Sequence, residues 1–206
     1  MTSRSCQSLL LFVSTILAYL ATSGPVYSQT YYQEQEVQVH NLPTLVARSH
    51  DPSEVLLASL ATIIHDQEMC CGKSSALEDI AQSADPKSLK DLSAKLEGRH
   101  LLSDGRPIHV SVEFLTPDAA TASRVITTLT DQHPFLMLWN SHLYVVYGVE
   151  YVQTVDYSSG ASAMVIRKFL LWDTRYSDQR RNVVFDRETE DPGKVQGLLS
   201  LQWRMN

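Results

Sequence analysis

The sequence predicts an α+β fold in which a helical N-terminal half packs on a C-terminal antiparallel sheet. Two patterns carry this prediction. Up to residue 98 the apolar residues recur with the spacing of helices, whereas beyond residue 107 they alternate or form short β-branched and aromatic runs. Helices followed by strands are typical of α+β domains. The chain has 206 residues, of which 44% are hydrophobic, and this is enough for one domain with a sizeable core.

Three helices are expected in the first half of the chain, and a fourth follows the first strand. They span residues 52–66, 73–84, 85–97 and 116–131. Asp51 is expected to cap the first helix, with Pro52 at the first helical position. Gly98 should end the third helix, because glycine readily adopts the backbone conformation that follows a helix.

The strands of the second half are expected to form one antiparallel sheet. They span residues 108–113, 135–139, 142–155, 164–172, 182–185 and 195–203. Asn140-Ser141 is expected to be a tight turn between two of them. The polar residues 29–50 lack a clear period and are expected to precede the domain, which would span residues 51–206, with residues 29–41 as a flexible tail.

The amino terminus has the pattern of a secretory signal peptide. Arg4 precedes an apolar run over residues 9–20, and residues 26–28 offer the small side chains that a signal peptidase reads. We therefore expect residues 1–28 to be removed by cleavage after Ser28. The mature protein would be secreted or periplasmic, without a stable membrane anchor. The alternative is an uncleaved anchor.

The charge balance argues against several partner classes. Lys and Arg number 17 and Asp and Glu number 23, so the formal net charge is -6 and the chain has no general attraction to nucleic acid. The sequence contains no recognisable Gly-rich nucleotide loop, and no cofactor is expected.

Two adjacent cysteines, Cys70 and Cys71, remain after the expected cleavage and stand just before the second predicted helix. A helix N-terminus favours the thiolate through its macrodipole and free N–H groups. Gln67, just upstream, could donate to a carbonyl oxygen that gains charge. The pair is equally compatible with two small buried residues or a vicinal disulfide. A metal site is disfavoured, because zinc-binding cysteines are typically separated by two to four residues.

His142 stands at the start of the most apolar predicted strand, and Asp173 ends the next one. A histidine there can act as the base for a thiol, and a carboxylate on the neighbouring strand can orient its ring. The alternatives are a histidine bonded to the backbone at the edge of the core and an aspartate that forms a turn. His65 and His109 are weaker candidates for the base, since the first is too close in sequence to Cys71 and the second occupies an exposed strand position.

These motifs resemble the papain-like cysteine peptidases, in particular the branch that processes bacteriocins. Cys71-Gly72 before a helix resembles the start of the family's central helix. Residues 132–149 resemble its block of proline, strand, histidine, strand and glycine, and residues 170–173 resemble the segment that ends with the orienting acid. The resemblance covers about residues 52–176.

The resemblance implies a papain-like fold and a thiol acyl hydrolase that acts on a peptide or protein substrate. It also implies Cys71 as the nucleophile, His142 as the base, Asp173 as the residue that orients the base and Gln67 as an oxyanion donor. Cys70 is a rival for the role of nucleophile.

A secreted binding or structural module without catalysis is the alternative function. In that case a set of tyrosines could form the contact surface: Tyr144, Tyr147, Tyr151, Tyr157 and Tyr176. The cationic cluster of Arg175, Arg180 and Arg181 is expected to be a solvated loop, because Asp178 and Asp186 balance its charge.

Overall fold

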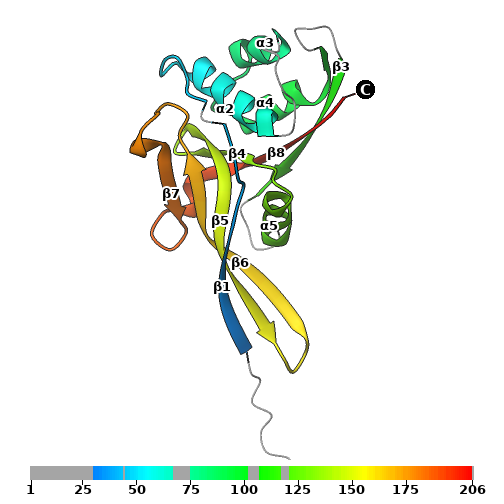
Figure 1. The fold of residues 1–206 in the computed structure, drawn as a ribbon, viewed down its shortest axis with the longest axis vertical. Helices are drawn as coiled ribbons and strands as arrows, with labels where there is room; N and C mark the ends of the chain where they lie inside the picture. The colour runs from blue at the N-terminus through cyan, green and yellow to red at the C-terminus, as the bar shows by residue number, and fades with distance from the viewer. Residues whose placement is uncertain (1–29, 44, 67–74, 102–106, 117–120, 206) are drawn as a thin grey trace, which may run out of the picture. The chain divides into compact units, whose positions relative to one another are not determined.

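The structure, a computed structural model shown in Figure 1, describes residues 30–43, 45–66, 75–101, 107–116 and 121–205. The chain divides into a small unit, residues 1–32 and 154–163, and a large unit, residues 33–153 and 164–206. Every residue of the site described below belongs to the large unit. The expected signal peptide and the predicted site residues Gln67, Cys70 and Cys71 lie outside the described residues.

The described residues form eight strands and four helices. The strands are β1 (Thr30–Gln38), β2 (Gly98–Leu101), β3 (Pro107–Leu115), β4 (Phe135–Trp139), β5 (His142–Asp156), β6 (Ala161–Trp172), β7 (Asn182–Asp186) and β8 (Val195–Met205). The helices are α2 (Pro52–Asp66), α3 (Ser75–Ser83), α4 (Leu89–Leu96) and α5 (Ala122–Thr130). Two 3-10 turns, Gln179–Arg181 and Pro192–Lys194, precede β7 and β8.

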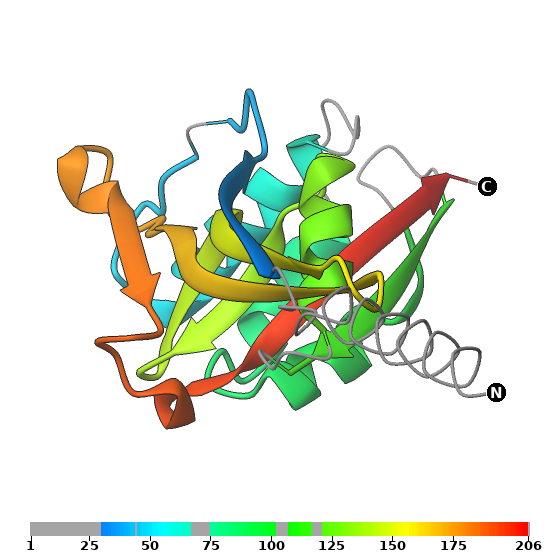
Figure 2. The same ribbon diagram turned by 90° about the horizontal axis from the view of Figure 1, so that it is seen from below.

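All eight strands belong to one sheet. Its order is β2-β3-β8-β4-β5-β6-β7, and β1 pairs with β5. Neighbouring strands such as β3 and β8 run antiparallel, and Figure 2 shows these two side by side. Because β8 lies between β3 and β4, the last strand of the chain occupies the middle of the sheet.

The expected fold class is wrong. The fold is 45% strand and 28% helix, with β1 before the first described helix and β2 immediately after α4, so the N-terminal half is not a helical layer. The sheet-rich architecture also corrects the papain-like fold that the resemblance implied. The error arose at β1 and β2, because neither sequence has the alternating apolar pattern that identifies a half-buried strand.

Strand β1 replaces the flexible tail expected at residues 29–41. Its sequence, TYYQEQEVQ, contains mostly polar side chains that stay exposed. The backbone nevertheless pairs with β5, and just beyond the strand the Val39 N–H donates to the Tyr147 carbonyl at 2.7 Å. Pairing through the backbone leaves no hydropathy signal, so the sequence pattern did not reveal it.

The elements with a clear apolar period are confirmed with shifts in their ends, the largest being α5, which begins at Ala122 rather than near residue 116. Helix α2 begins and ends as expected, and Asp51 Oδ1 accepts a hydrogen bond from the Ser53 N–H at 2.9 Å. Helix α4 begins later than expected because Ser88 is its cap: the Ser88 hydroxyl accepts from the Asp91 N–H at 3.2 Å. Asp85-Pro86 therefore forms a turn before the helix.

The centre of the sheet is buried on both faces. All five residues of β4 are buried, and they alternate between two apolar clusters. Leu136 and Leu138 pack with residues of α2, α3 and α4, whereas Phe135 and Met137 pack with residues of α5. The large unit thus has three layers, with α2, α3 and α4 on one face of the sheet and α5 on the other (Figure 1).

Gly148 in β5 allows the close approach of the chain at β1. A Cβ atom there would lie 2.7 Å from the Val37 carbonyl oxygen, 2.9 Å from Gln38 Cγ and 3.1 Å from Leu170 Cδ1. The first contact is with backbone, so it cannot be relieved by rotating a side chain.

The Gly148→Ala variant is expected to lose about 1–3 kcal/mol of unfolding free energy, because the added methyl group overpacks this contact. Urea denaturation measures the loss. Gly193→Ala is the matched control, since its nearest neighbour is the Asp191 side chain at 3.2 Å in an exposed turn. Equal stability of the two variants would contradict the close approach of β1 to β5.

Candidate functional site

His142, the predicted base, opens β5 and is exposed. It follows the expected turn, in which Asn140 and Ser141 both have a positive φ, 50° and 62°. Two such residues form the kind of two-residue turn that matches the twist of a hairpin. The turn pairs Trp139 with His142, so the imidazole projects from the end of a hairpin whose other residues are mostly buried.

Asp173, the predicted orienting acid, follows β6 directly and is almost completely buried. Its carboxylate is held by Arg175: Oδ1 accepts from the backbone N–H at 3.0 Å and from Nε at 2.7 Å, and Oδ2 accepts from Nη2 at 2.5 Å. The side chain of Asp173 is 3% exposed and that of Arg175 18% exposed. A bidentate arginine–carboxylate pair of this kind is among the strongest hydrogen-bonded contacts in proteins.

Arg175 stands between Asp173 and His142. Its Nη1 lies 3.1 Å from His142 Nδ1. The structure therefore brings the predicted base and the predicted acid to one guanidinium group, and these two described side chains share no hydrogen bond of their own. The sequence pattern had suggested a direct contact from the carboxylate to the ring.

The contact with Arg175 fixes the tautomer of His142. A guanidinium group only donates hydrogen bonds, so Nδ1 must be the acceptor and the ring proton must sit on Nε2. In this state the free nitrogen of His142 is a donor. A general base needs a free lone pair at the nitrogen that faces its substrate, and this arrangement supplies none.

The loop that carries Asp173 and Arg175 is anchored to α2 by buried hydroxyl groups. Ser59 and Thr174 are both fully buried, and their oxygens lie 3.1 Å apart. Ser59 Oγ donates to the Val55 carbonyl at 2.8 Å, and Thr174 Oγ1 lies 3.3 Å from the same oxygen. The Ala47 N–H donates to the Thr174 carbonyl at 2.8 Å. Contacts of Thr174 with helix α2 and with the Ala47 backbone thus hold the position of the neighbouring Arg175.

A small pocket of about 180 Å³ lies beside His142. It is formed where the start of α2, the turn before α4, the β4–β5 turn and the Arg175 loop meet. Its lining residues are His50, Pro52, Val55, Pro86, Lys87, Ser141, His142, Leu143 and Arg175. Three of these side chains, His50, Lys87 and Arg175, can carry a positive charge, and none is acidic.

The pocket lies at the start of α2, and the cysteine pair follows the last residue of this helix in the sequence. Helix α2 has 15 residues, so its two ends are about 21 Å apart. Pro52 and Val55 of the first turns line the pocket, and Asp66 is the last residue of the helix.

The surroundings of Arg175 are aromatic. Its guanidinium carbon lies 5.9 Å from the centre of the Tyr144 ring and 5.7 Å from that of Tyr176. The hydrogen bonds to Asp173 raise the pKa of Arg175 above its usual value, and burial raises the pKa of Tyr144. Arg175 therefore stays charged, and Tyr144 keeps its proton throughout the physiological range.

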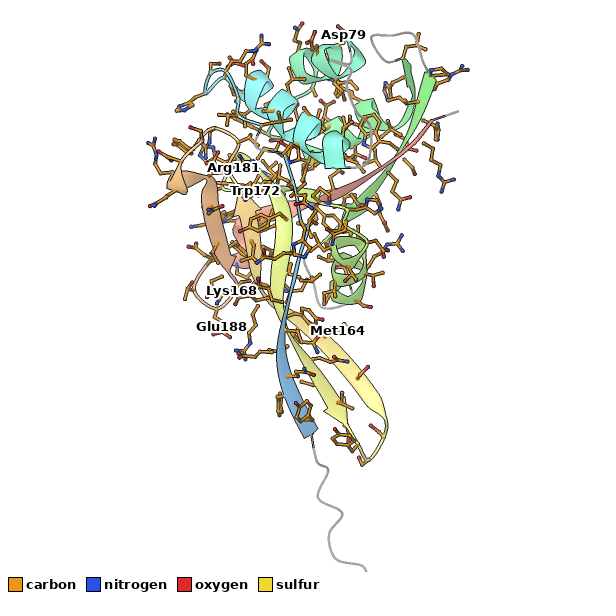
Figure 3. The ribbon with its side chains drawn as sticks, in the orientation of Figure 1. Asp79, Met164, Lys168, Trp172, Arg181 and Glu188 are labelled. Atoms are coloured by element: carbon orange, nitrogen blue, oxygen red, sulfur yellow. The ribbon has the colours of Figure 1, made fainter. Side chains whose placement is uncertain are left out.

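Arg181 corrects the expectation of a solvated arginine loop, because it is 4% exposed. Its guanidinium group lies 4.2 Å from the Trp172 ring, and Figure 3 shows the two residues next to each other. Nη2 donates to the Pro43 carbonyl at 3.2 Å, while Nε and Nη1 have no hydrogen-bond partner among the described residues. Burial lowers the pKa of Arg181 from its usual value. Of the cluster, only Arg180 is exposed, as expected.

The other predicted residues take up ordinary positions. His109 is exposed on β3, as the sequence predicts. Tyr144 is buried against Trp139, and Tyr147 is partly buried, with its ring centre 4.9 Å from that of Trp172, so these two tyrosines pack with the core rather than forming a contact surface.

The described ranges contain no group of three or more His, Cys, Asp or Glu side chains that could hold a metal ion. Within the same ranges, no helix is long and apolar enough to cross a membrane. In comparisons with known proteins, no family model and no curated protein matches the sequence.

Arg175 is the functional residue that the sequence pattern did not reveal. Its signal is the pattern Asp-x-Arg directly after a strand, in which a short turn can fold the guanidinium back onto the carboxylate. From the sequence, Asp173 resembles an orienting acid and Arg175 a member of a solvated cluster. Neither prediction includes a contact between the two side chains.

Two matched variants test the different roles of the buried arginines. Arg175→Met should cost about 3–5 kcal/mol of unfolding free energy, because it leaves the Asp173 carboxylate buried without a partner. Arg181→Met should leave the stability unchanged or raise it, because it removes a buried charge that has no counter-ion among the described residues. Chemical denaturation of both variants measures the difference. Similar losses in the two would contradict this assignment of partners.

Proposed function

We propose that the protein is an exported binding module whose ligand enters the pocket beside His142. Hydrogen-bond donors and apolar side chains surround this pocket, as is usual for small-ligand sites. The anchored Arg175 loop keeps the donors in place before a ligand arrives, and such preorganisation favours binding.

The observation that carries the proposal is the contact between Arg175 Nη1 and His142 Nδ1. It makes the imidazole a donor at Nε2 and keeps the Asp173 carboxylate bound to the guanidinium. A ligand with an acceptor oxygen fits such a site, whereas activation of a thiol requires a free lone pair on the ring, and Arg175 occupies the one at Nδ1.

A cysteine peptidase or related thiol acyl hydrolase is the second candidate. It is favoured by the meeting of His142 and Asp173 at one guanidinium group beside a pocket. In this mechanism the Cys71 thiolate would attack an acyl carbonyl, with Gln67 donating to the oxyanion, and His142 would protonate the leaving group as its bond to the carbonyl breaks; water would then hydrolyse the thioester and restore the thiol. Arg175 would have to leave its place so that Asp173 could orient the ring.

An electrophilic, cysteine-directed activity probe separates the two candidates. The binding module predicts that labelling of the purified protein is the same within about twofold in the wild type and in His142→Ala, because no base assists the thiol. The hydrolase predicts labelling at Cys71 that falls about 100-fold or more in His142→Ala, the usual contribution of a general base.

Cys71→Ala and Cys70→Ala identify the labelled thiol, and His109→Ala is the matched control for loss of an exposed strand histidine. Strong labelling of Cys71 that depends on His142 but not on His109 would overturn the binding module in favour of the hydrolase.

A further inference from the structure

We propose that the pocket beside His142 binds a carboxylate group carried on a short apolar body. The inference rests on the proposed function, ligand binding at this site, and adds the chemical class of the ligand.

The charge of the pocket indicates an anion. Three lining side chains can carry a positive charge, His50, Lys87 and Arg175, His142 adds a neutral N–H donor, and the lining contains no carboxylate. Asp173 balances the charge of Arg175, but no carboxylate in the described part of the chain forms an ion pair with Lys87. A positive charge therefore remains at the rim of the pocket.

The carboxylates next to the lining residues in sequence are engaged in local turns. Asp51 Oδ1 accepts from the backbone N–H and the hydroxyl of Ser53, at 2.9 Å and 2.6 Å. Asp85 Oδ1 accepts from the Lys87 N–H at 2.9 Å. Neither aspartate lines the pocket, so neither occupies the place of an incoming anion.

Unused donors remain on the same side chains. Arg175 has five N–H groups: Nε and one hydrogen of Nη2 bind Asp173, and one hydrogen of Nη1 binds His142. A further guanidinium hydrogen bonds the Tyr144 side chain, so one is left, together with the Nε2 hydrogen of His142. A carboxylate has two oxygens that accept several hydrogen bonds, and hydrogen bonds to a charged acceptor are the strong kind.

The walls of the pocket indicate what carries the carboxylate. Pro52 and Val55 come from α2, Pro86 from the turn before α4 and Leu143 from β5. The pocket of about 180 Å³ is comparable to a cavity of about 150 Å³ that holds one benzene molecule. One short branched or cyclic hydrocarbon group fits this space. A strongly hydrated anion without an apolar part, such as phosphate, would leave the apolar walls unused.

Titration of the purified protein with four probes, followed by the NMR signals of the His142 and His50 rings, tests the proposal. N-acetyl-leucine carries the carboxylate of a peptide end, and N-acetyl-leucinamide is its neutral counterpart. Isovalerate carries the same alkyl group on a simple acid, and inorganic phosphate is an anion without an apolar part.

N-acetyl-leucine is expected to bind about tenfold or more tightly than N-acetyl-leucinamide and phosphate, because only the acid satisfies both the donors and the apolar walls. Raising the salt concentration should weaken its binding, since part of the attraction is electrostatic. If isovalerate binds as tightly as N-acetyl-leucine, a simple carboxylic acid is a sufficient ligand. If isovalerate binds more weakly, the preferred ligand is the carboxylate end of a peptide.

Lys87→Gln should weaken binding of N-acetyl-leucine several-fold without affecting the fold, because Lys87 is exposed. Lys90→Gln, an exposed lysine of α4 outside the pocket, is the matched control and should bind like the wild type. Equal affinity for the acid and the amide, or tighter binding of phosphate, would overturn the carboxylate proposal while leaving a binding site. If no probe shifts either histidine signal, the proposed binding function fails with it.

Discussion

The geometry of the site depends on one guanidinium group held between a buried carboxylate and an exposed imidazole. Asp173 fixes Arg175 by three hydrogen bonds, and Arg175 in turn fixes the orientation and the tautomer of His142. Because the carboxylate is buried, it needs this partner, and the arginine therefore stays in place whether or not a ligand is present. The chemistry available to His142 follows from this arrangement. The ring can donate a hydrogen bond from Nε2, whereas proton abstraction would require Arg175 to move.

Two segments of the fold hold the guanidinium group of Arg175 and the His142 ring together: the β4–β5 turn and the loop after β6. The β4–β5 hairpin, whose strands supply apolar side chains to both faces of the sheet, presents His142 at its turn. The loop after β6 is held by the buried hydroxyl contact between Thr174 and Ser59 of α2. Helix α2 consequently has two roles: its apolar face covers the sheet, and its first turns form one wall of the pocket. A rigid three-layer core thus supports a site made from short loops, as is common in binding proteins.

The sequence allowed prediction of the elements whose side chains alternate or recur with a helical period, because burial of those side chains is what places them. Helix α2 and the hairpin around Asn140-Ser141 are examples. Strand β1 could not be found in this way, because its side chains are mostly polar and exposed, and the backbone pairing with β5 leaves no hydropathy pattern. Missing it changed the fold class. For the site, His142 and Asp173 were found as separate residues, but the contact that joins them was not. An arginine such as Arg175 is predicted to be exposed because its side chain is charged. It is largely buried here because it lies two residues after the buried Asp173 and binds its carboxylate.

The ring-nitrogen NMR signals of His142 in the wild-type protein at neutral pH test the central claim most directly. The structure requires an unprotonated, hydrogen-bond-accepting Nδ1 and a protonated Nε2. The spectrum should therefore show the neutral Nε2–H tautomer, and this preference should disappear in Arg175→Met. A proton on Nδ1 in the wild type, either as the other neutral tautomer or as an imidazolium ion, would show that Arg175 does not govern His142 and would contradict this account of the site.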